Sequence, residues 1–278
     1  MKLSEYSPLS WKANLGLTCA LVDQRTVIVN REHVGPLLIQ RALYPEGERV
    51  CQIIILHPPG GIAGGDQLAI TCLVKAHAHV QLTTPGATKW YEGFGEPSRQ
   101  EINITVESEG VCEWLPQENI VFNNALVNMS TNVSVELDGV FVGWEFTALG
   151  RHSELSPFAE GELGQVMRID YNGRPVYIDR LRLLPDSFFD GPALLDEFRS
   201  FGLMVVVGPS LEKEMIDKLR IISETVDHCS VTERDGVLIA RWLGLDIENG
   251  RDVFTKMWAL LRPVYTTKNA VIPRIWKT

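Results

Sequence analysis

Residues 130–146 read STNVSVELDGVFVGWEF, and this stretch decides the fold class. Its apolar residues Val133, Val135 and Leu137 alternate with polar ones until the Asp138-Gly139 pair turns the chain. Alternation with a period of two indicates a strand with one buried face, and Asp-Gly between two such runs predicts a β-hairpin. We therefore expect two paired strands here.

The same period dominates the chain from residue 13 to about residue 190. QEINITVES at 100–108 alternates in the same way, and Asn172-Gly173 predicts a second hairpin between GQVMRIDY and RPVYIDRLRL. Short strands separated by turns at roughly ten-residue spacing are typical of a sandwich, a barrel or a β-solenoid, not of an alternating α/β fold. No repeat of fixed length is visible, so the period alone does not single out the solenoid.

The pattern changes to a helical period after residue 190. Residues 209–224 predict a helix with Ser210 as its N-cap, and residues 250–263 predict a second helix that ends at Pro263. GVLIARWLG at 236–244 reads as a strand between them. We expect one mainly β domain over 1–278, with a β-rich body at 1–190 and a dependent α+β portion at 191–278, because no linker rich in Pro, Gly or Ser separates the two.

Charge and cysteine content restrict the class of protein. The net charge is −9, and residues 1–190 hold 23 acidic against 14 basic residues. Such a field repels nucleic acids and anionic membranes and favours cations or a basic partner. The five cysteines contain no CxxC pair, and the N-terminus shows no apolar run of signal-peptide length. No stretch approaches a membrane span, so we expect a cytoplasmic protein with reduced thiols.

The loop LHPPGGIAGGDQL at 56–68 is unusually rich in residues that shape the backbone. Glycine permits positive φ and close backbone approach, whereas proline fixes its own φ. A phosphate-binding loop would need Lys and Ser/Thr after its last glycine, and Asp66 and Gln67 stand there instead. We therefore predict a structural corner between two strands, formed by Pro58, Pro59, Gly60, Gly61, Gly64 and Gly65.

The sequence shows no GxSxG, no HExxH and no cluster of cysteines with metal-site spacing, which favours a protein that is not an enzyme. Candidate metal contacts are His57 and the pair His77 and His79, which would share one face of a strand in KAHAHVQLTT. The structural alternative is favoured for each, with His57 as a loop anchor and the pair as a polar strand face. His228 and Cys229 would point to opposite faces of a strand and so would not share a metal.

Three acids interrupt strongly β segments: Asp66, Glu145 and Asp179. They lie either on a solvent face or along a wet internal passage, because a buried unpaired charge is too costly. A passage lined with carboxylates would attract a dication without trapping it as thiolates would. The alternative is a β-rich hydrolase of a sugar or small polar ligand, with two of these acids as general acid and base.

Six segments, in order along the chain, resemble the urease accessory protein UreD (UreH) family. They are HVGPLLIQRALYP at 33–45, HPPGGIAGGD at 57–66, TTPGATKWY at 83–91, WLPQENIVF at 114–122, GWEFTALGR at 143–151 and PRIW at 273–276. Two departures from the family pattern are Glu92, where a basic residue is usual, and Asn123-Asn124, where an acidic or small pair is usual.

The resemblance implies an extended, β-helix-like body of stacked strands with a small helical part. It implies a non-enzymatic scaffold that binds apo-urease (UreABC) and UreF, with UreG docking through UreF, and it allows a dimeric higher assembly through UreF and UreG. It also implies that Ni(II) is in transit rather than stably bound, moving along an internal passage. Carried over residue by residue, the passage positions are Asp66, Thr88, Glu145 and Asp179. His79 stands where family members often have histidine, and no role is carried to His77.

Overall fold

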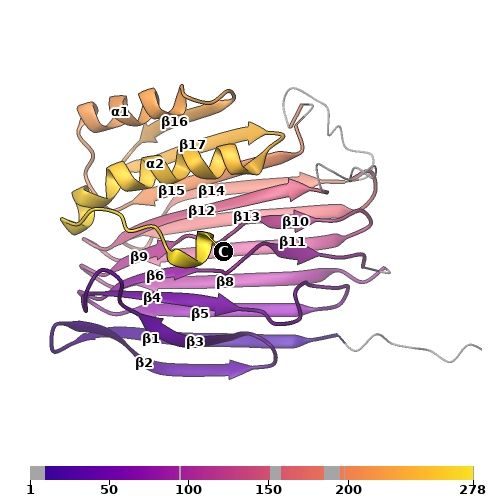
Figure 1. The fold of residues 1–278 in the computed structure, drawn as a ribbon, viewed down its shortest axis with the longest axis horizontal. Coiled ribbons are helices and arrows are strands. Elements are labelled where there is room, and N and C mark those ends of the chain that lie inside the picture. Colours follow the sequence, from indigo (N-terminus) through magenta and orange to yellow (C-terminus); the bar gives the residue numbers. More distant parts are fainter. Residues whose placement is uncertain (1–9, 94, 151–157, 185–194, 197, 278) are drawn as a thin grey trace, which may run out of the picture.

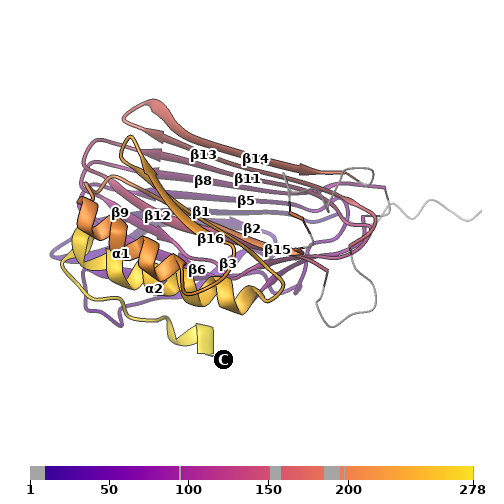
Figure 2. The ribbon, with the colours of Figure 1, turned by 90° about the horizontal axis from the view of Figure 1, so that it is seen from above.

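Stacked strands in two facing sheets make up most of the molecule (Figures 1 and 2). The structure is a computed structural model and describes residues 10–93, 95–150, 158–184, 195–196 and 198–277. Figure 2 shows the sheets as two layers, with both helices outside one of them. We call the uncovered layer sheet A and the layer under the helices sheet B.

Sheet A has seven strands. Their order across the sheet is β14 (Arg174–Leu183), β13 (Glu162–Tyr171), β11 (Leu126–Val135), β8 (Ser98–Val106), β5 (Gln67–Val74), β1 (Lys12–Val22) and β2 (Arg25–Val34). The strands from β13 to β1 run parallel to one another, whereas the two edge strands pair antiparallel to their neighbours.

Sheet B faces it with ten strands. Their order is β16 (Cys229–Arg234), β17 (Val237–Gly244), β15 (Ser200–Val207), β12 (Val140–Leu149), β9 (Val111–Trp114), β6 (His79–Thr83), β4 (Val50–Leu56) and β3 (Leu38–Leu43), while β10 (Asn119–Val121) pairs with β12 and with β7 (Thr88–Trp90). From β4 to β13 the chain passes repeatedly between the sheets and adds each new strand parallel to the one before it. The predicted mainly β, stacked-strand body is therefore confirmed.

The two predicted hairpins have different outcomes. Asn172-Gly173 joins β13 and β14 as an antiparallel pair, and both residues have positive φ (48° and 73°), as the expected turn requires. The hairpin predicted at Asp138-Gly139 is wrong, because β11 lies in sheet A and β12 in sheet B. The turn residues were correctly located, but here the turn carries the chain from one layer to the other.

The C-terminal portion continues sheet B through β15, β17 and β16 and then covers its outer face with α1 (Lys213–Ser223) and α2 (Ile247–Thr266). The cap predicted at Ser210 is wrong, since Glu212 is the N-cap residue and its side chain makes no capping bond. The end predicted at Pro263 is also wrong. Pro263 lies inside α2, which continues to Thr266 and is capped by Thr267 in the left-handed conformation. Whether residues 1–278 form a single folding unit stays a prediction.

Apolar side chains form one core on each side of sheet B. The larger core fills the space between the sheets, with Phe141 of β12 and Trp114 of β9 among its members. The second core lies under the helices and includes Trp144 and Phe146 of β12 and Trp258 of α2. Successive residues of β12 therefore alternate between the two cores, as the period of two requires. Both faces of the strand are buried, so a polar residue on either face needs a partner.

Two further findings concern the class of protein. Among the described residues, no helix has the length and apolar content to cross a bilayer. All five cysteines are unpaired thiols, and four of them are buried.

Candidate functional site

A cavity of about 320 Å³ lies between the sheets, next to the glycine-rich loop. Its wall includes the predicted site residues His57, Thr88 and Glu145, and the predicted loop residues Gly60 and Gly61. Residues 84–89 and Trp114, Pro116, Gln117 and Asn119 contribute much of the remaining wall. Residues from five of the six resembling segments, at 33–45, 57–66, 83–91, 114–122 and 143–151, therefore line one cavity although these segments are far apart in sequence.

Two glycines of the loop, Gly61 and Gly64, are needed for close contact with the neighbouring turn of the chain. A Cβ added to Gly64 would lie 2.2 Å from the carbonyl oxygen of Gly93, and one added to Gly61 would lie 2.1 Å from the ring of Tyr91. Hydrogen bonds from Ile62 N to Lys89 O (2.7 Å) and from Tyr91 N to Ile62 O (2.8 Å) hold the two segments together. The loop is thus a packed corner between β4 and β5, and it forms part of the cavity wall.

Glu145 is the only carboxylate among the described residues that line the cavity. It lies on β12 facing sheet A, and its carboxylate accepts hydrogen bonds from the Thr131 hydroxyl of β11 and from Gln165 Nε2 of β13 (3.0 Å). Burial raises the pKa of Glu145, and the two hydrogen bonds act in the opposite direction. The group is therefore a buried carboxylate, held from the opposite sheet, whose charged form is disfavoured.

His57 follows β4 and lines the cavity. Its Nε2 is buried and makes no hydrogen bond with any described residue. Burial lowers the pKa of His57, and the charge of Asp66 opposes this shift. A neutral imidazole with an unused nitrogen on a cavity wall is a chemically competent ligand for a transition metal ion.

Asp66 is not among the cavity residues. Its carboxylate accepts hydrogen bonds from the backbone N–H groups of Trp11 (2.7 Å) and Ala63 (2.9 Å), which closes the glycine-rich loop and anchors the start of β1. Asp179 also lies outside the cavity wall. It projects from β14 toward sheet B, where Arg241 Nη2 of β17 donates to its Oδ1 (2.7 Å). The charge of Asp179 nonetheless contributes to the raised pKa of Glu145.

His77 and His79 do not form a pair. His77 lies before β6 in a turn with φ of 60°, is exposed, and contacts Glu109. His79, Gln81 and Thr83 do share one face of β6, but it is the outer face of sheet B, away from the cavity. His228 lies just before β16, where its ring packs on Phe198 at 4.5 Å between centroids. In the described part of the chain, no three His, Cys, Asp or Glu side chains come together closely enough to hold a metal ion.

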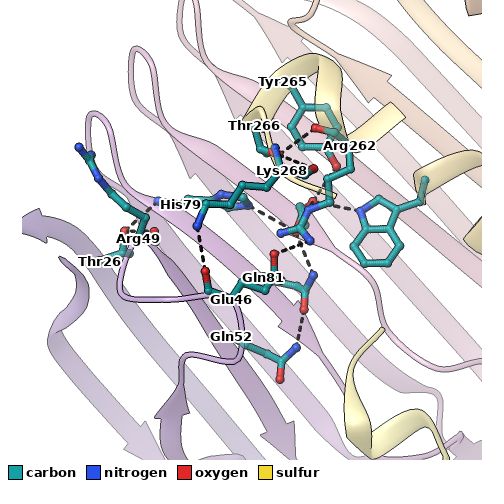
Figure 3. A network of polar contacts seen from close by, with 12 residues as sticks. Thr26, Glu46, Arg49, Gln52, His79, Gln81, Arg262, Tyr265, Thr266 and Lys268 are labelled. Atoms are coloured by element: carbon teal, nitrogen blue, oxygen red, sulfur yellow. Dashed lines mark hydrogen bonds and ion pairs between the residues drawn. The ribbon is translucent and has the colours of Figure 1, made fainter. Parts of the chain in front are cut away.

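A second polar cluster lies on the outer face of sheet B, beneath the C-terminal half of α2 (Figure 3). Its centre is the fully buried Glu113 of β9. Oε1 of Glu113 accepts from Trp258 Nε1 (3.0 Å) and Tyr265 OH (2.6 Å) and lies 2.9 Å from Arg262 Nε. Oε2 accepts from Gln81 Nε2 (3.0 Å) and lies 3.4 Å from His79 Nε2.

Buried charges of opposite sign lie in contact in this cluster and balance one another. Arg262 is fully buried, and its Nη1 also lies 2.7 Å from Glu46 Oε2. Burial alone would raise the pKa of Glu113, but His79, Arg262 and Tyr265 together lower it to about 2. The cluster joins α2, β9, β6 and the turn before β4, so its evident role is to fasten the C-terminal helix to sheet B. Sequence reasoning missed Glu113, although a lone acid inside VCEWL is the same signal that drew attention to Glu145.

Comparison with known families decides which family the chain represents. The family model described as UreD urease accessory protein matches residues 12–277. The chain belongs to the UreD urease accessory protein family. The resemblance found in the six sequence segments is thereby confirmed.

Individual relatives agree with this assignment. The UreD of Dechloromonas aromatica is 41% identical and the alignment covers 99% of this chain and 96% of the relative. The UreD of Methylobacillus flagellatus is 37% identical, with 100% of this chain and 98% of the relative covered. The UreD of Azoarcus sp. strain BH72 is 39% identical, with 96% and 94% covered. Among the described residues, all the UreD-like segments except PRIW contribute to the lining of the cavity. Arg151, the last residue of GWEFTALGR, lies outside the described residues.

Proposed function

We propose that the protein is a non-enzymatic scaffold of urease maturation in the cytoplasm. In this role it bridges apo-urease and UreF, with UreG docking through UreF, and conducts Ni(II) between the two sheets toward the urease active site. Membership of the urease accessory family supports the maturation role. The single observation that carries the passage is the cavity between the sheets, because it brings His57, Thr88 and Glu145 together on one wall.

The ligands on this wall suit an ion in transit. An imidazole nitrogen, a hydroxyl and one carboxylate can each replace a water of a divalent ion, but no thiolate cluster among the described residues would retain it. Burial disfavours the charged form of Glu145, and an entering dication would favour that form again by displacing the proton from the carboxyl group. Weak, successive contacts of this kind favour movement over storage.

Asp66 and Asp179 extend the proposed passage beyond the cavity. The charge of Asp66 acts on His57, and the charge of Asp179 acts on Glu145. The charges of the two carboxylates therefore act on residues of the cavity wall, although neither carboxylate lines the cavity. We assign them to the two ends of the path, Asp66 through its effect on His57 and Asp179 through its effect on Glu145. His79 lies on the other face of sheet B, and we give it no part in the passage.

The alternative of a hydrolase receives less support. Glycoside hydrolysis uses two carboxyl groups about 5 to 9.5 Å apart at an accessible cleft. Glu145 is the only carboxylate on the described cavity wall, and Asp179 is engaged by Arg241. The acidic charge of −9 also disfavours nucleic acid as a partner.

The proposal is tested by expressing urease structural genes with all accessory genes, with or without this one. We expect urease purified without this protein to lack nickel and activity, and a pull-down of this protein to recover apo-urease and UreF. Urease that acquires full activity in its absence would refute the maturation role. Loss of nickel without any recoverable complex would refute the scaffold.

A further inference from the structure

Strand β14 forms a free edge of sheet A and carries an unusual run of side chains on its outer face. It pairs with β13 alone in the described structure. Ile178, Arg180 and Arg182 lie on the outer face, and all three are exposed. The register shift between Ile169 and Asp170 of β13 places Arg174 opposite Tyr171 at the hairpin end of the strand, where Arg174 and Val176 are also exposed. The exposed fractions of Val176 and Ile178 are 37% and 47%. Figure 2 shows β14 at the border of the layer that no helix covers.

The three arginines have no partners among the described residues. Within the described residues, Arg174, Arg180 and Arg182 make no ion pair and no side-chain hydrogen bond, whereas Arg168 on β13 is paired with Asp170. The chain has a net charge of −9, and its first 190 residues hold 14 basic against 23 acidic side chains. Three unpaired arginines on one strand are therefore a local reversal of the overall charge.

The inward face of β14 is fixed to the opposite sheet. Arg241 Nη2 of β17 donates to Tyr177 OH (2.9 Å) and to Asp179 Oδ1 (2.7 Å), so one side chain of sheet B holds two neighbouring positions of the strand. A strand held in this way presents its edge N–H and C=O groups, and its arginine row, in one fixed geometry. A fixed edge lowers the entropy cost of adding another strand.

We propose that the β14 edge binds an extended, acidic segment of a partner protein by strand addition. Edge backbone groups would pair with the segment, its acidic side chains would lie beside Arg180 and Arg182 and near Arg174 at the hairpin end, and its apolar side chains would cover Val176 and Ile178. A second copy of this chain paired through the same edge is disfavoured, because like charges would then lie opposite one another. The proposal does not rest on the nickel passage, since neither the cavity nor Glu145 takes part in it, and Asp179 serves here only by holding the strand through Arg241.

The arginines could instead serve only to keep the edge from aggregating, which any charge achieves. Charge reversal separates these two roles. Arg174→Glu, Arg180→Glu and Arg182→Glu combined keep the edge charged but would repel an acidic segment. The matched control is Arg31→Glu, Lys213→Glu and Lys256→Glu combined, which changes the net charge equally at exposed positions away from β14.

The probe is a fluorescent peptide of about eight alternating Glu and Val residues, a typical strand length. We expect the full-length protein to bind it in anisotropy titrations, and a Lys-Val peptide not to bind. The β14 reversal should weaken binding at least about tenfold, since three exposed charge pairs are replaced by repulsion. The control reversal should change it less than about twofold, and raising the ionic strength from about 0.05 to about 0.5 M should weaken wild-type binding.

Hydrogen exchange distinguishes strand addition from a mere charge contact. Bound peptide should slow amide exchange within residues 174–183 and leave β2, the other edge of sheet A, unchanged. Absence of saturable binding, equal weakening by both reversals, or binding without protection of β14 would each overturn the proposal. So would a wild-type dimer, seen by sedimentation, that the β14 reversal abolishes, because the occupant would then be a second copy.

Discussion

Replacing Glu113 by Gln tests the physical reasoning about buried charge in this fold. Glu113 is fully buried, and its carboxylate meets Trp258, Tyr265, Gln81, Arg262 and His79. Glutamine has nearly the same shape but no charge. Its amide NH2 group would face N–H and O–H groups that now donate to the carboxylate. Among the described residues, the change leaves Arg262 paired with the carboxylate of Glu46 alone.

The magnitude follows from the pKa. A pKa of about 2 in place of the ordinary 4.5 is a difference of about 2.5 units, and one unit corresponds to about 1.36 kcal/mol. The charged form of Glu113 therefore stabilises the fold by about 3 kcal/mol, and breaking one side of a buried ion pair costs about 3 to 5 kcal/mol. We expect Glu113→Gln to lower the free energy of unfolding by about 3 kcal/mol at neutral pH.

The dependence on pH has a definite sign. A carboxylate whose pKa is lowered by folding stabilises the protein fully above its unfolded pKa, and this contribution is lost as the pH falls through its folded pKa. The difference between wild type and Glu113→Gln should therefore be constant at neutral pH and shrink between pH of about 4.5 and about 2. Urea unfolding followed by tryptophan fluorescence measures this difference at each pH.

The matched control is Glu109→Gln. Glu109 lies in the turn two residues before β9, and its side chain is 62% exposed and contacts His77. Its effect should remain within about 0.5 kcal/mol, as is usual for exposed sites. A loss below about 1 kcal/mol for Glu113→Gln, or a loss equal to that of the control, would refute the account of the cluster.

Three further predictions concern the cavity between the sheets and the glycine-rich loop. Glu145→Gln should leave the free energy of unfolding at neutral pH unchanged or raised, because burial already disfavours the charged form of Glu145; a loss like that of Glu113→Gln in urea unfolding would contradict this. Gly64→Ala should destabilise by about 1 to 3 kcal/mol, since its Cβ would meet the Gly93 backbone, whereas Gly86→Ala, with no atom within 4 Å, should be near neutral in the same assay. Asp66→Ala should lower the thermal midpoint because two backbone N–H groups lose their acceptor, and an unchanged midpoint would show that these hydrogen bonds contribute nothing.

Local patterns in the sequence predicted elements better than connections. The period of two located the strands, and Asn172-Gly173 predicted the β13–β14 hairpin, because both signals depend only on neighbouring residues. Asp138-Gly139 predicted a turn but not its partner strands, since a turn between two layers and a turn within one sheet use the same residues. Pro263 did not end α2, because packing of Met257, Trp258 and Leu261 against sheet B outweighs one missing backbone hydrogen bond.

The candidate site was partly visible for the same reason. Glu145 stands out as a lone acid in an apolar strand, and that signal alone shows that it needs a partner, not which core it faces. Its partners Thr131 and Gln165 come from sheet A, and nothing in their own segments indicates this contact. The cavity is lined by segments that are far apart in sequence, so only the stacking of the strands brings His57, Thr88 and Glu145 together.

The nickel content of urease made with Glu145→Gln tests the central claim most directly. Urease would be purified from cells that express all the structural and accessory genes with the wild-type protein, with Glu145→Gln or with Glu109→Gln, and its nickel measured by mass spectrometry. We predict that Glu145→Gln lowers the nickel per active site while the variant still copurifies with apo-urease, and that Glu109→Gln changes neither. Full nickel content with Glu145→Gln would contradict a passage along the inter-sheet cavity.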